Sequence, residues 1–244
     1  METALDKTEL FEKTPIRQAA LSLIIPTILS QVVMLIYNMA DTWYIGQTGD
    51  PYQVAAVTLT YPVFMIMNAF ANLYGIGGSS LISRMLGAGE KEKTGAVATF
   101  SLWSAGMVSL IYALFCLLFD GPLLSVLGAD PVSLSHAKDY LFWTVVIGGL
   151  PTVISLVLAN IIRAQGDAKI ASIGMSLGGF INVLLDPVLI FLFNMGVEGA
   201  ALSTCLSNTI SLLFLMNYAQ FKKIVALSNL IQRIYRNDIR NRLP

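Results

Sequence analysis

Six long apolar runs with almost no charge are the feature that most constrains how this chain can fold. Five of them contain no Asp, Glu, Lys or Arg, and the sixth is interrupted only by Asp186. The runs cover residues 18–40, 52–83, 94–119, 140–162, 170–197 and 199–221. A helix needs roughly 20 apolar residues to cross about 30 Å of hydrocarbon, and each run reaches that length. The sequence therefore predicts an all-α membrane protein with six transmembrane helices.

The composition agrees with this fold class. Of the 244 residues, 55% are hydrophobic and 12% are charged, a balance outside that of soluble domains. The runs are too long for the alternating strands of about 10 residues that build an outer-membrane barrel. Residues 1–14 carry both signs of charge and contain no small-residue cleavage site, so we do not expect a removable signal peptide. One helical bundle in the plasma membrane is the expected architecture.

The basic residues predict the orientation of the bundle. Alternate connections and the two ends hold 14 of the 15 Lys and Arg residues, and only Lys138 lies on the other side. The positive-inside rule then places both termini in the cytoplasm. We expect three regions: a cytoplasmic segment over 1–17, a six-helix lobe over 18–221 and a basic amphipathic tail over 222–244. A disordered charged tail is the alternative for the last region.

Four prolines inside the runs predict kinked helices, because proline lacks the N–H of the helix ladder. They are Pro26, Pro62, Pro151 and Pro187. We take Pro26 and Pro187 as candidate hinges, although proline is also common in membrane helices without any hinge role. Glycines at 174 and 178 suit close packing between helices.

The few residues suited to covalent or metal chemistry argue against an enzyme of the common kinds. His136 is the only histidine and falls in a polar connection, so neither a catalytic triad nor a histidine-rich metal site can be built. Cys116 and Cys205 lie inside apolar runs, where free cysteine packs as a small hydrophobic residue. We expect no cofactor.

Two carboxylates inside the runs are the strongest functional signals. An ionisable side chain in the membrane costs about 2.5–3.5 kcal/mol, so it marks a functional site by default. At 1.5 Å per residue Asp41 lies about 34 Å along its run and Asp186 about 24 Å, so both fall in the outer half. Asn182 precedes Asp186 by one turn, and Thr204 on the last run reaches a similar level.

These oxygen donors suit a hard cation or a proton. Na⁺ prefers hard oxygen ligands, such as carboxylate, amide and hydroxyl oxygens, to soft sulfur ligands. The alternatives are that Asp41 only caps the outer end of its helix and that Asp186 makes a structural polar contact. In the inner half, Asn68, Asn72 and Asn160 either line a cavity or serve as hydrogen-bonding links between helices.

Four segments resemble a known family. They are "YNMADTWYIGQTGD", "SRMLGAGEKEKTG", "IIRAQGDAK" and "NVLLDPVLIFLFNMGVEGAALST". In order and without obvious gaps, they are similar to segments of MATE (multidrug and toxic compound extrusion) transporters. Members of that family have two six-helix lobes, and they exchange a cytoplasmic organic cation or drug for external Na⁺ or H⁺.

The resemblance implies roles for particular residues. It places the coupling-ion ligands, for Na⁺ or H⁺, on four side chains: Asp41, Asn182, Asp186 and Thr204. It also makes Tyr37 and Asn160 candidates for the wall of the substrate cavity. The 244 residues hold six of the family's twelve helices, so transport is expected to need a second six-helix lobe or a homodimer.

Other functions stay open at this point. A fragment without transport activity and a lipid-handling half-transporter would both have six helices. An intramembrane aspartyl protease also needs two membrane carboxylates, but the sequences NMADT and LLDPV lack the Gly-x-Gly-Asp setting of such enzymes. We expect membrane lipid and a small organic cation as partners, and no nucleic acid.

Overall fold

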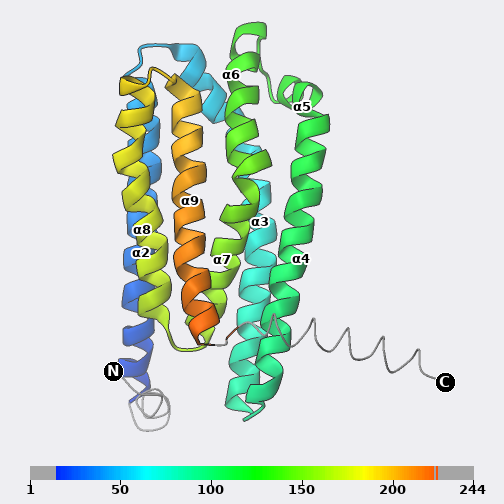
Figure 1. Ribbon diagram of the computed structural model, residues 1–244, viewed down its shortest axis with the longest axis vertical. Coiled ribbons are helices and arrows are strands. Elements are labelled where there is room, and N and C mark those ends of the chain that lie inside the picture. Colours follow the sequence, from blue (N-terminus) through cyan, green and yellow to red (C-terminus); the bar gives the residue numbers. More distant parts are fainter. Residues whose placement is uncertain (1–14, 223, 225–244) are drawn as a thin grey trace, which may run out of the picture.

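A computed structural model describes residues 15–222 and 224, and these residues form helices joined by short turns, without strands. The elements are α2 (Ile16–Gly46), α3 (Pro51–Gly87), α4 (Lys91–Leu118), α5 (Asp120–Val126), α6 (Pro131–Leu141), the π-helix η1 (Phe142–Ile147), α7 (Gly149–Ala164), α8 (Ala168–Pro187), the π-helix η2 (Val188–Leu192) and α9 (Gly196–Phe221). The helices run alternately up and down in one bundle (Figure 1). The amphipathic tail predicted for 222–244 lies outside the described residues apart from 222 and 224.

The predicted six-span bundle is confirmed. Five of the described helices are long and apolar enough to cross a membrane, and the sixth span is the pair Pro131–Ile147 and Gly149–Ala164 with a 46° bend between its parts. We call the end of the bundle where α2 begins the base and the opposite end the top, as in Figure 1.

The fourth span begins nine residues earlier than its apolar run, so the prediction of a polar connection around His136 was wrong. Asp130 accepts hydrogen bonds from the backbone N–H groups of Val132 and Ser133, and the Ser133 hydroxyl accepts one from the Asp130 N–H. This capping box, with Pro131 in the first turn, starts a helix in a polar sequence. The same N–H donors lower the pKa of the Asp130 carboxyl.

The bend in the fourth span comes from glycine and not from proline. The backbone N–H of Gly148 donates to the Trp143 carbonyl at 2.9 Å, which is the wider i to i+5 turn of a π-helix. A Cβ at position 148 would lie 2.6 Å from that same oxygen, so only glycine fits. Pro151 lies in the first turn of α7, where its missing N–H costs nothing.

Small residues let the helices on one side of the bundle approach closely. A Cβ at Gly178 of α8 would lie 3.1 Å from the Ser211 Cβ on α9. At Gly174, one turn below, an added Cβ would lie 2.5 Å from a methyl carbon of Leu215. The expectation that these two glycines serve helix packing is confirmed.

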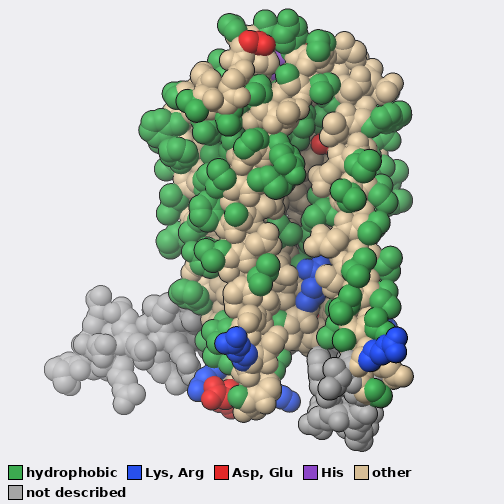
Figure 2. Space-filling model, turned by 180° about the vertical axis from the view of Figure 1, so that it is seen from behind, with side chains coloured by type: hydrophobic (Ala, Val, Ile, Leu, Met, Phe, Trp, Pro, Cys, Tyr) green, Lys and Arg blue, Asp and Glu red, His purple; other side chains and the backbone are tan. Residues whose placement is uncertain are grey.

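The outer surface of the bundle is apolar, and its charges gather at the ends. Large hydrophobic side chains such as Leu35, Trp103 and Phe180 are exposed. Figure 2 shows hydrophobic side chains along the length of one face of the bundle. In the most apolar stretch of α2 6% of the residues are buried, against 28% in α3, so α2 lies at the edge of the bundle. This surface requires a cover of lipid or of other apolar helices.

A groove runs along the rear of the bundle, between α2 and α3. Helix α2 packs mainly against α8, whereas α3 packs mainly against α7 and α4. Figure 2 shows the hollow that is left between them, with acidic atoms in its upper part and basic atoms farther down.

Candidate functional site

Asp186 stands at the centre of a buried polar cluster. It lies on α8 directly before Pro187, has 0% exposure, and accepts hydrogen bonds from the Ser203 hydroxyl and, at 3.3 Å, from the Asn182 amide. That amide nitrogen also donates to Ser203 Oγ at 2.7 Å and to Thr204 Oγ1 at 3.2 Å. The structure thus brings three of the predicted ion ligands together and adds Ser203, which our sequence reasoning missed.

Asp41 belongs to the same region and does not cap a helix end. Helix α2 continues to Gly46, more than one turn past Asp41, and the side chain has 7% exposure. Asp41 accepts a hydrogen bond from the Tyr140 hydroxyl of α6 at 3.4 Å. Its carboxylate also lies within electrostatic range of Asp186. Both carboxylates are therefore held inside the bundle, as the ion-site interpretation requires.

Tyr37 and Tyr140 complete the surroundings of the two carboxylates. Tyr37 lies one turn below Asp41 and packs its ring on Gly179, where an added Cβ would be 2.7 Å from a ring carbon. Electrostatic interactions link both tyrosines to Asp41 and Asp186. Tyr140 is the first residue of the fourth apolar run, and no signal in the sequence marks it as part of this cluster.

Three oxygen atoms in this cluster are buried and receive no hydrogen bond. They are Oδ1 of Asp41, Oδ2 of Asp186 and Oδ1 of Asn182. Buried acceptors are almost always satisfied, so three open ones in a single cluster call for a hydrogen-bond donor or a cation that binds there. The donor set fits a proton or Na⁺, since all its atoms are hard oxygens. Among the described residues, no group of three or more His, Cys, Asp or Glu could hold a metal ion.

The predicted inner asparagines do not gather at one place. Asn68 is half-buried and donates to the Phe64 carbonyl of its own helix at 3.1 Å, and Asn72 is exposed. Asn160 of α7 is half-buried and packs on α3, where a Cβ at Gly75 would lie 2.8 Å from its amide nitrogen.

Arg163 differs from its prediction. The sequence placed it in a connection between spans, but α7 continues to Ala164, so Arg163 lies in the last helical turn and is half-buried. Its guanidinium donates to Ser30 Oγ on α2 and to Asn160 Oδ1, each at 3.4 Å. The spacing i, i+3 from Asn160 is the sequence signal for this contact.

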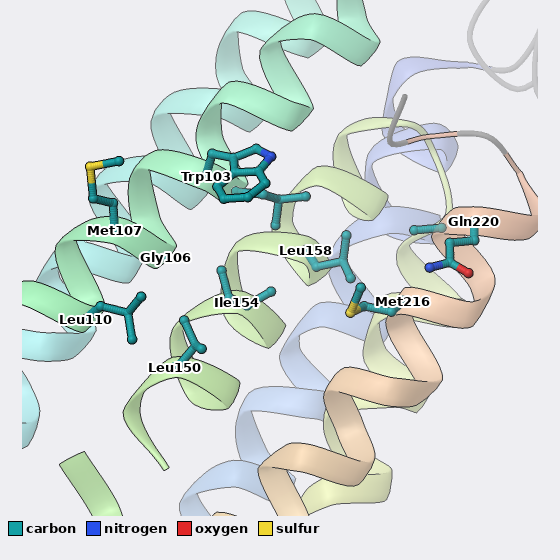
Figure 3. A pocket seen from close by; sticks show the side chains of 11 residues that line it. Trp103, Gly106, Met107, Leu110, Leu150, Ile154, Leu158, Met216 and Gln220 are labelled. Carbon is teal, nitrogen blue, oxygen red and sulfur yellow. The ribbon is translucent and has the colours of Figure 1, made fainter. Parts of the chain in front are cut away.

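Two cavities lie away from the carboxylates. One, of about 350 Å³, lies between α4, α7 and α9 and is lined by apolar side chains such as Trp103, Ile154 and Met216, with Gln220 at its edge (Figure 3). The other, of about 530 Å³, lies between α2 and α8 and includes the candidate hinge Pro26. Neither cavity is lined by an acidic residue.

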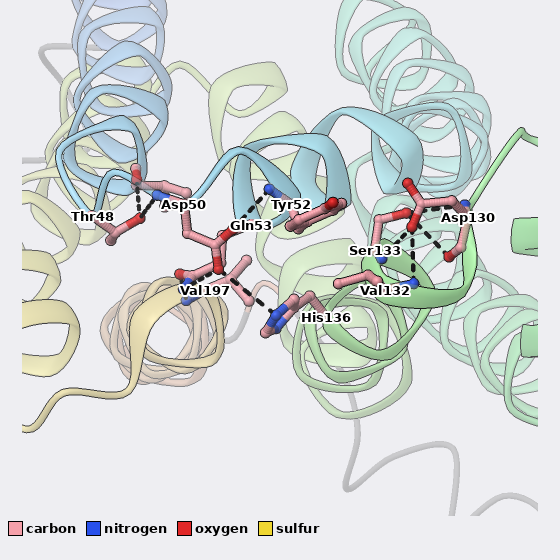
Figure 4. A network of polar contacts seen from close by, with 10 residues as sticks. Thr48, Asp50, Tyr52, Gln53, Asp130, Val132, Ser133, His136 and Val197 are labelled. Carbon is pink, nitrogen blue, oxygen red and sulfur yellow. Dashed lines mark hydrogen bonds and ion pairs between the residues drawn. The ribbon is translucent and has the colours of Figure 1, made fainter.

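A polar network joins the tops of three helices (Figure 4). Gln53 of α3 accepts a hydrogen bond from the Val197 N–H of α9 at 2.9 Å and donates one to Asp50 at 3.2 Å. The Asp50 carboxylate lies 3.9 Å from Nε2 of His136 on α6. These contacts fix the tops of the helices that carry Tyr140 and Thr204.

The sequence of this chain matches a known protein family and proteins of that family. The MatE family model matches residues 26–188. The multidrug export protein MepA of Staphylococcus haemolyticus (strain JCSC1435) is 36% identical over 209 residues, covering 85% of this chain and 46% of that protein.

Solved structures agree with the family match. A MATE structure in the straight conformation superposes with a TM-score of 0.82 and 33% identity, over 90% of this chain and 48% of that chain. One in the bent conformation gives a TM-score of 0.75 and 34% identity, over 83% of this chain and 45% of that chain. This chain therefore spans about half the length of the relatives it matches.

Proposed function

This chain belongs to the MatE family of membrane transporters, and from that premise we propose that it forms the first lobe of a cation-coupled multidrug exporter. The observation that carries the coupling role is the pair of buried carboxylates, Asp41 and Asp186, with open oxygen atoms. The exported substrates are organic cations or drugs, in line with the multidrug export named for MepA.

The coupling ion, H⁺ or Na⁺, binds between α2, α8 and α9. Asp41 comes from α2, Asn182 and Asp186 from α8, and Thr204 from α9, so one bound charge draws three helices together. Two buried carboxylates repel each other unless a cation or a proton neutralises them. Ion arrival and release therefore change the force between α2 and its neighbours.

Helix α2 responds by bending near Pro26. Pro26 lies inside α2 and cannot donate a backbone hydrogen bond, so the helix is weakest there. Related MATE structures exist in straight and bent conformations, which supports such a motion. Pro187, followed by the π-helix η2, gives α8 a second point of weakness beside Asp186.

Alternating access needs two halves that move around a shared site. The second half is another six-helix lobe or a second copy of this chain, and it covers the groove between α2 and α3. We expect both ends of the described chain to face the cytoplasm, so that the groove loads substrate from inside.

Two other functions are less well supported. An intramembrane protease would require water to reach two carboxylates, whereas Asp186 has 0% exposure. A lipid-handling half-transporter could use the apolar cavity beside Trp103, but that role leaves the buried carboxylates unexplained.

The test is Asp186→Asn in the complete transporter that contains this chain. We expect ethidium efflux from cells to fall at least about tenfold, because the amide cannot carry the charge that binds the coupling ion. The matched control is Glu90→Gln, which removes a carboxylate from an exposed position at the base. Unchanged efflux that still responds to the ion gradient in Asp186→Asn would overturn the coupling role.

A further inference from the structure

The guanidinium of Arg163 has no charged partner among the described residues. Its two hydrogen bonds, both 3.4 Å long, go to a hydroxyl and an amide oxygen, and its Nε is buried with no acceptor. A guanidinium has five N–H donors, so most of its hydrogen-bonding capacity is unused here. A half-buried, incompletely satisfied cation is costly unless an anion joins it.

The side chain of Arg163 extends from the last turn of α7 into the bundle, toward α2. Ser30, which it contacts, is ten residues beyond the start of the membrane-crossing stretch of α2 at Ala20. Ten residues of helix span about 15 Å, so Ser30 and the guanidinium that it contacts lie inside the apolar stretch of α2 and not at its end. Ionisable groups at this depth mark ligand paths in membrane proteins.

The position of Arg163 between helices places it on the floor of the groove. Its Ser30 contact is on α2, while Asn160, its other partner, packs against Gly75 of α3. Helix α7 therefore bridges the gap between α2 and α3 at this level. Basic atoms are visible in that part of the groove in Figure 2, below the acidic ones.

We propose that Arg163, with Ser30 and Asn160, forms an oxyanion-binding subsite in the groove. A carboxylate, sulfonate or phosphate group would complete the guanidinium fork. The Ser30 hydroxyl already donates to the Thr27 carbonyl, and one Asn160 amide hydrogen is donated to the Leu156 carbonyl. These two residues therefore orient the guanidinium, and Asn160 keeps one N–H for the oxyanion. Asp41 is eleven residues above Ser30 on α2, so the acidic and basic subsites are about 16 Å apart along the groove.

This separation defines the class of ligand. A molecule that carries both a cationic and an oxyanionic group can engage both subsites at once, and a simple cation engages only the upper one. The inference rests on the proposed function only for the claim that the ligand is exported. Binding itself is a property of this chain and is measured without transport.

A purely structural role for Arg163 is the alternative. A basic residue in the last turn of α7 also interacts favourably with the helix dipole and tethers α7 to α2. That role predicts a loss of thermal stability on substitution with no effect on anion binding, so the two roles give different results.

The experiment measures fluorescence anisotropy of carboxyfluorescein titrated with the purified 244-residue chain in dodecyl maltoside. We expect saturable binding by wild type and binding at least about tenfold weaker for Arg163→Gln, because charge-assisted hydrogen bonds are lost. Arg163→Lys keeps the charge but not the fork, and an intermediate affinity is expected. This second variant tests the subsite if Arg163→Gln fails to fold.

Controls separate this result from general effects of charge and from the coupling site. Arg84→Gln removes an exposed arginine and should bind within about twofold of wild type, as surface charges contribute little. Carboxyfluorescein binding is measured without an ion gradient and without transport, so the subsite and the coupling role can fail independently. The proposal is overturned if wild type shows no saturable binding or if Arg163→Gln binds as well as wild type.

A last arm identifies the source of the oxyanion. Phosphatidylglycerol is added to the micelles, with diacylglycerol as the uncharged control. Competition by the former alone assigns the subsite to an anionic lipid headgroup. Absence of competition assigns it to a soluble anionic molecule, and both results support an oxyanion subsite.

Discussion

The Asn182 side chain orders the buried polar cluster. Its nitrogen lies 2.7–3.3 Å from acceptor atoms of Asp186, Ser203 and Thr204. Because the nitrogen faces these three groups, the carbonyl oxygen on the other side of the amide is left without a donor. Ser203 stabilises this orientation, since it accepts from Asn182 and donates to Asp186.

Removing the Ser203 hydroxyl should therefore weaken the cluster without touching a charge. We expect Ser203→Ala to lower the free energy of unfolding by about 1 kcal/mol, because Asp186 loses a buried donor. The measurement is denaturation of the purified chain in mixed micelles with increasing dodecyl sulfate. Ser80→Ala, at an exposed position on α3, is the control and should change stability little. Equal stability of the two variants would show that the Ser203 contact is unimportant.

The sequence identifies polar and ionisable residues that lie inside an apolar run. Asp41, Asn182, Asp186 and Thr204 are polar residues in the outer half of apolar runs, and the resemblance to MATE transporters implied that they bind the coupling ion together. Serine and tyrosine are common in membrane helices, so nothing in the sequence separated Ser203 and Tyr140 from residues without a role. They were found only once the neighbouring helices were in place.

Arg163 was missed for a different reason. The positive-inside pattern explained it as a residue of a connection between spans, so nothing indicated that Arg163 makes contacts inside the bundle. Its contact with Ser30 joins residues 133 positions apart, which periodicity within one helix cannot reveal.

At the scale of elements, α8 and α9 pack closely because glycines of α8 carry no side chain at their contact. At Gly174 an added methyl group would meet Leu215 at 2.5 Å and Phe214 at 3.0 Å. Leu215 has 0% exposure and is surrounded by neighbours, so it cannot move aside freely.

Gly174→Ala should therefore separate α8 from α9. We expect a loss of about 1–3 kcal/mol in the free energy of unfolding, the usual cost of overpacking. Gly77→Ala provides the opposite case, because nothing lies within 4 Å of its added Cβ and alanine favours a helix. Gly77→Ala should be neutral or stabilising in the same dodecyl sulfate assay. If both variants lose stability equally, packing at Gly174 is not the cause.

The elements themselves were predictable to different degrees. All six spans were predicted from apolar runs, because the length of hydrocarbon to be crossed is fixed. The ends were less well predicted: α2 and α3 extend beyond their runs, and α6 begins in polar sequence through the capping of Asp130. The short helix α5 has no apolar run of its own. Both π-helices lie inside apolar runs, and their wider turns depend on local hydrogen bonds that apolar composition does not predict.

At the scale of the whole molecule, the two ends of the bundle differ in charge. The base carries Arg84, Lys91 and Lys93, while the top has acidic residues such as Asp50 and Asp120. This asymmetry predicts which end faces the cytoplasm. Cys116 and Cys205 are free and have 0% and 6% exposure, so thiol reagents reach neither easily.

The orientation can therefore be measured with single introduced cysteines. Gln47→Cys exposes a thiol at the top, and Ala88→Cys exposes one at the base. In intact cells we expect a membrane-impermeant maleimide to label Gln47→Cys only, and to label Ala88→Cys after permeabilisation. Wild type should stay unlabelled in both conditions. The reverse pattern would mean that the bundle is inserted in the opposite sense.

The position of α2 at the edge of the bundle has a mechanical consequence. Helix α2 packs mainly against α8 and makes fewer contacts with α3 and α9, so its upper part would move as a unit if the helix bends at Pro26, as we propose. Asp41 is fifteen residues above Pro26, or about 22 Å, so a tilt of about 10° would displace its carboxylate by about 4 Å. A displacement of this size exceeds the 3.4 Å that now separates Asp41 from the Tyr140 hydroxyl. A small angular change at one proline would thus break the contact between Asp41 and Tyr140.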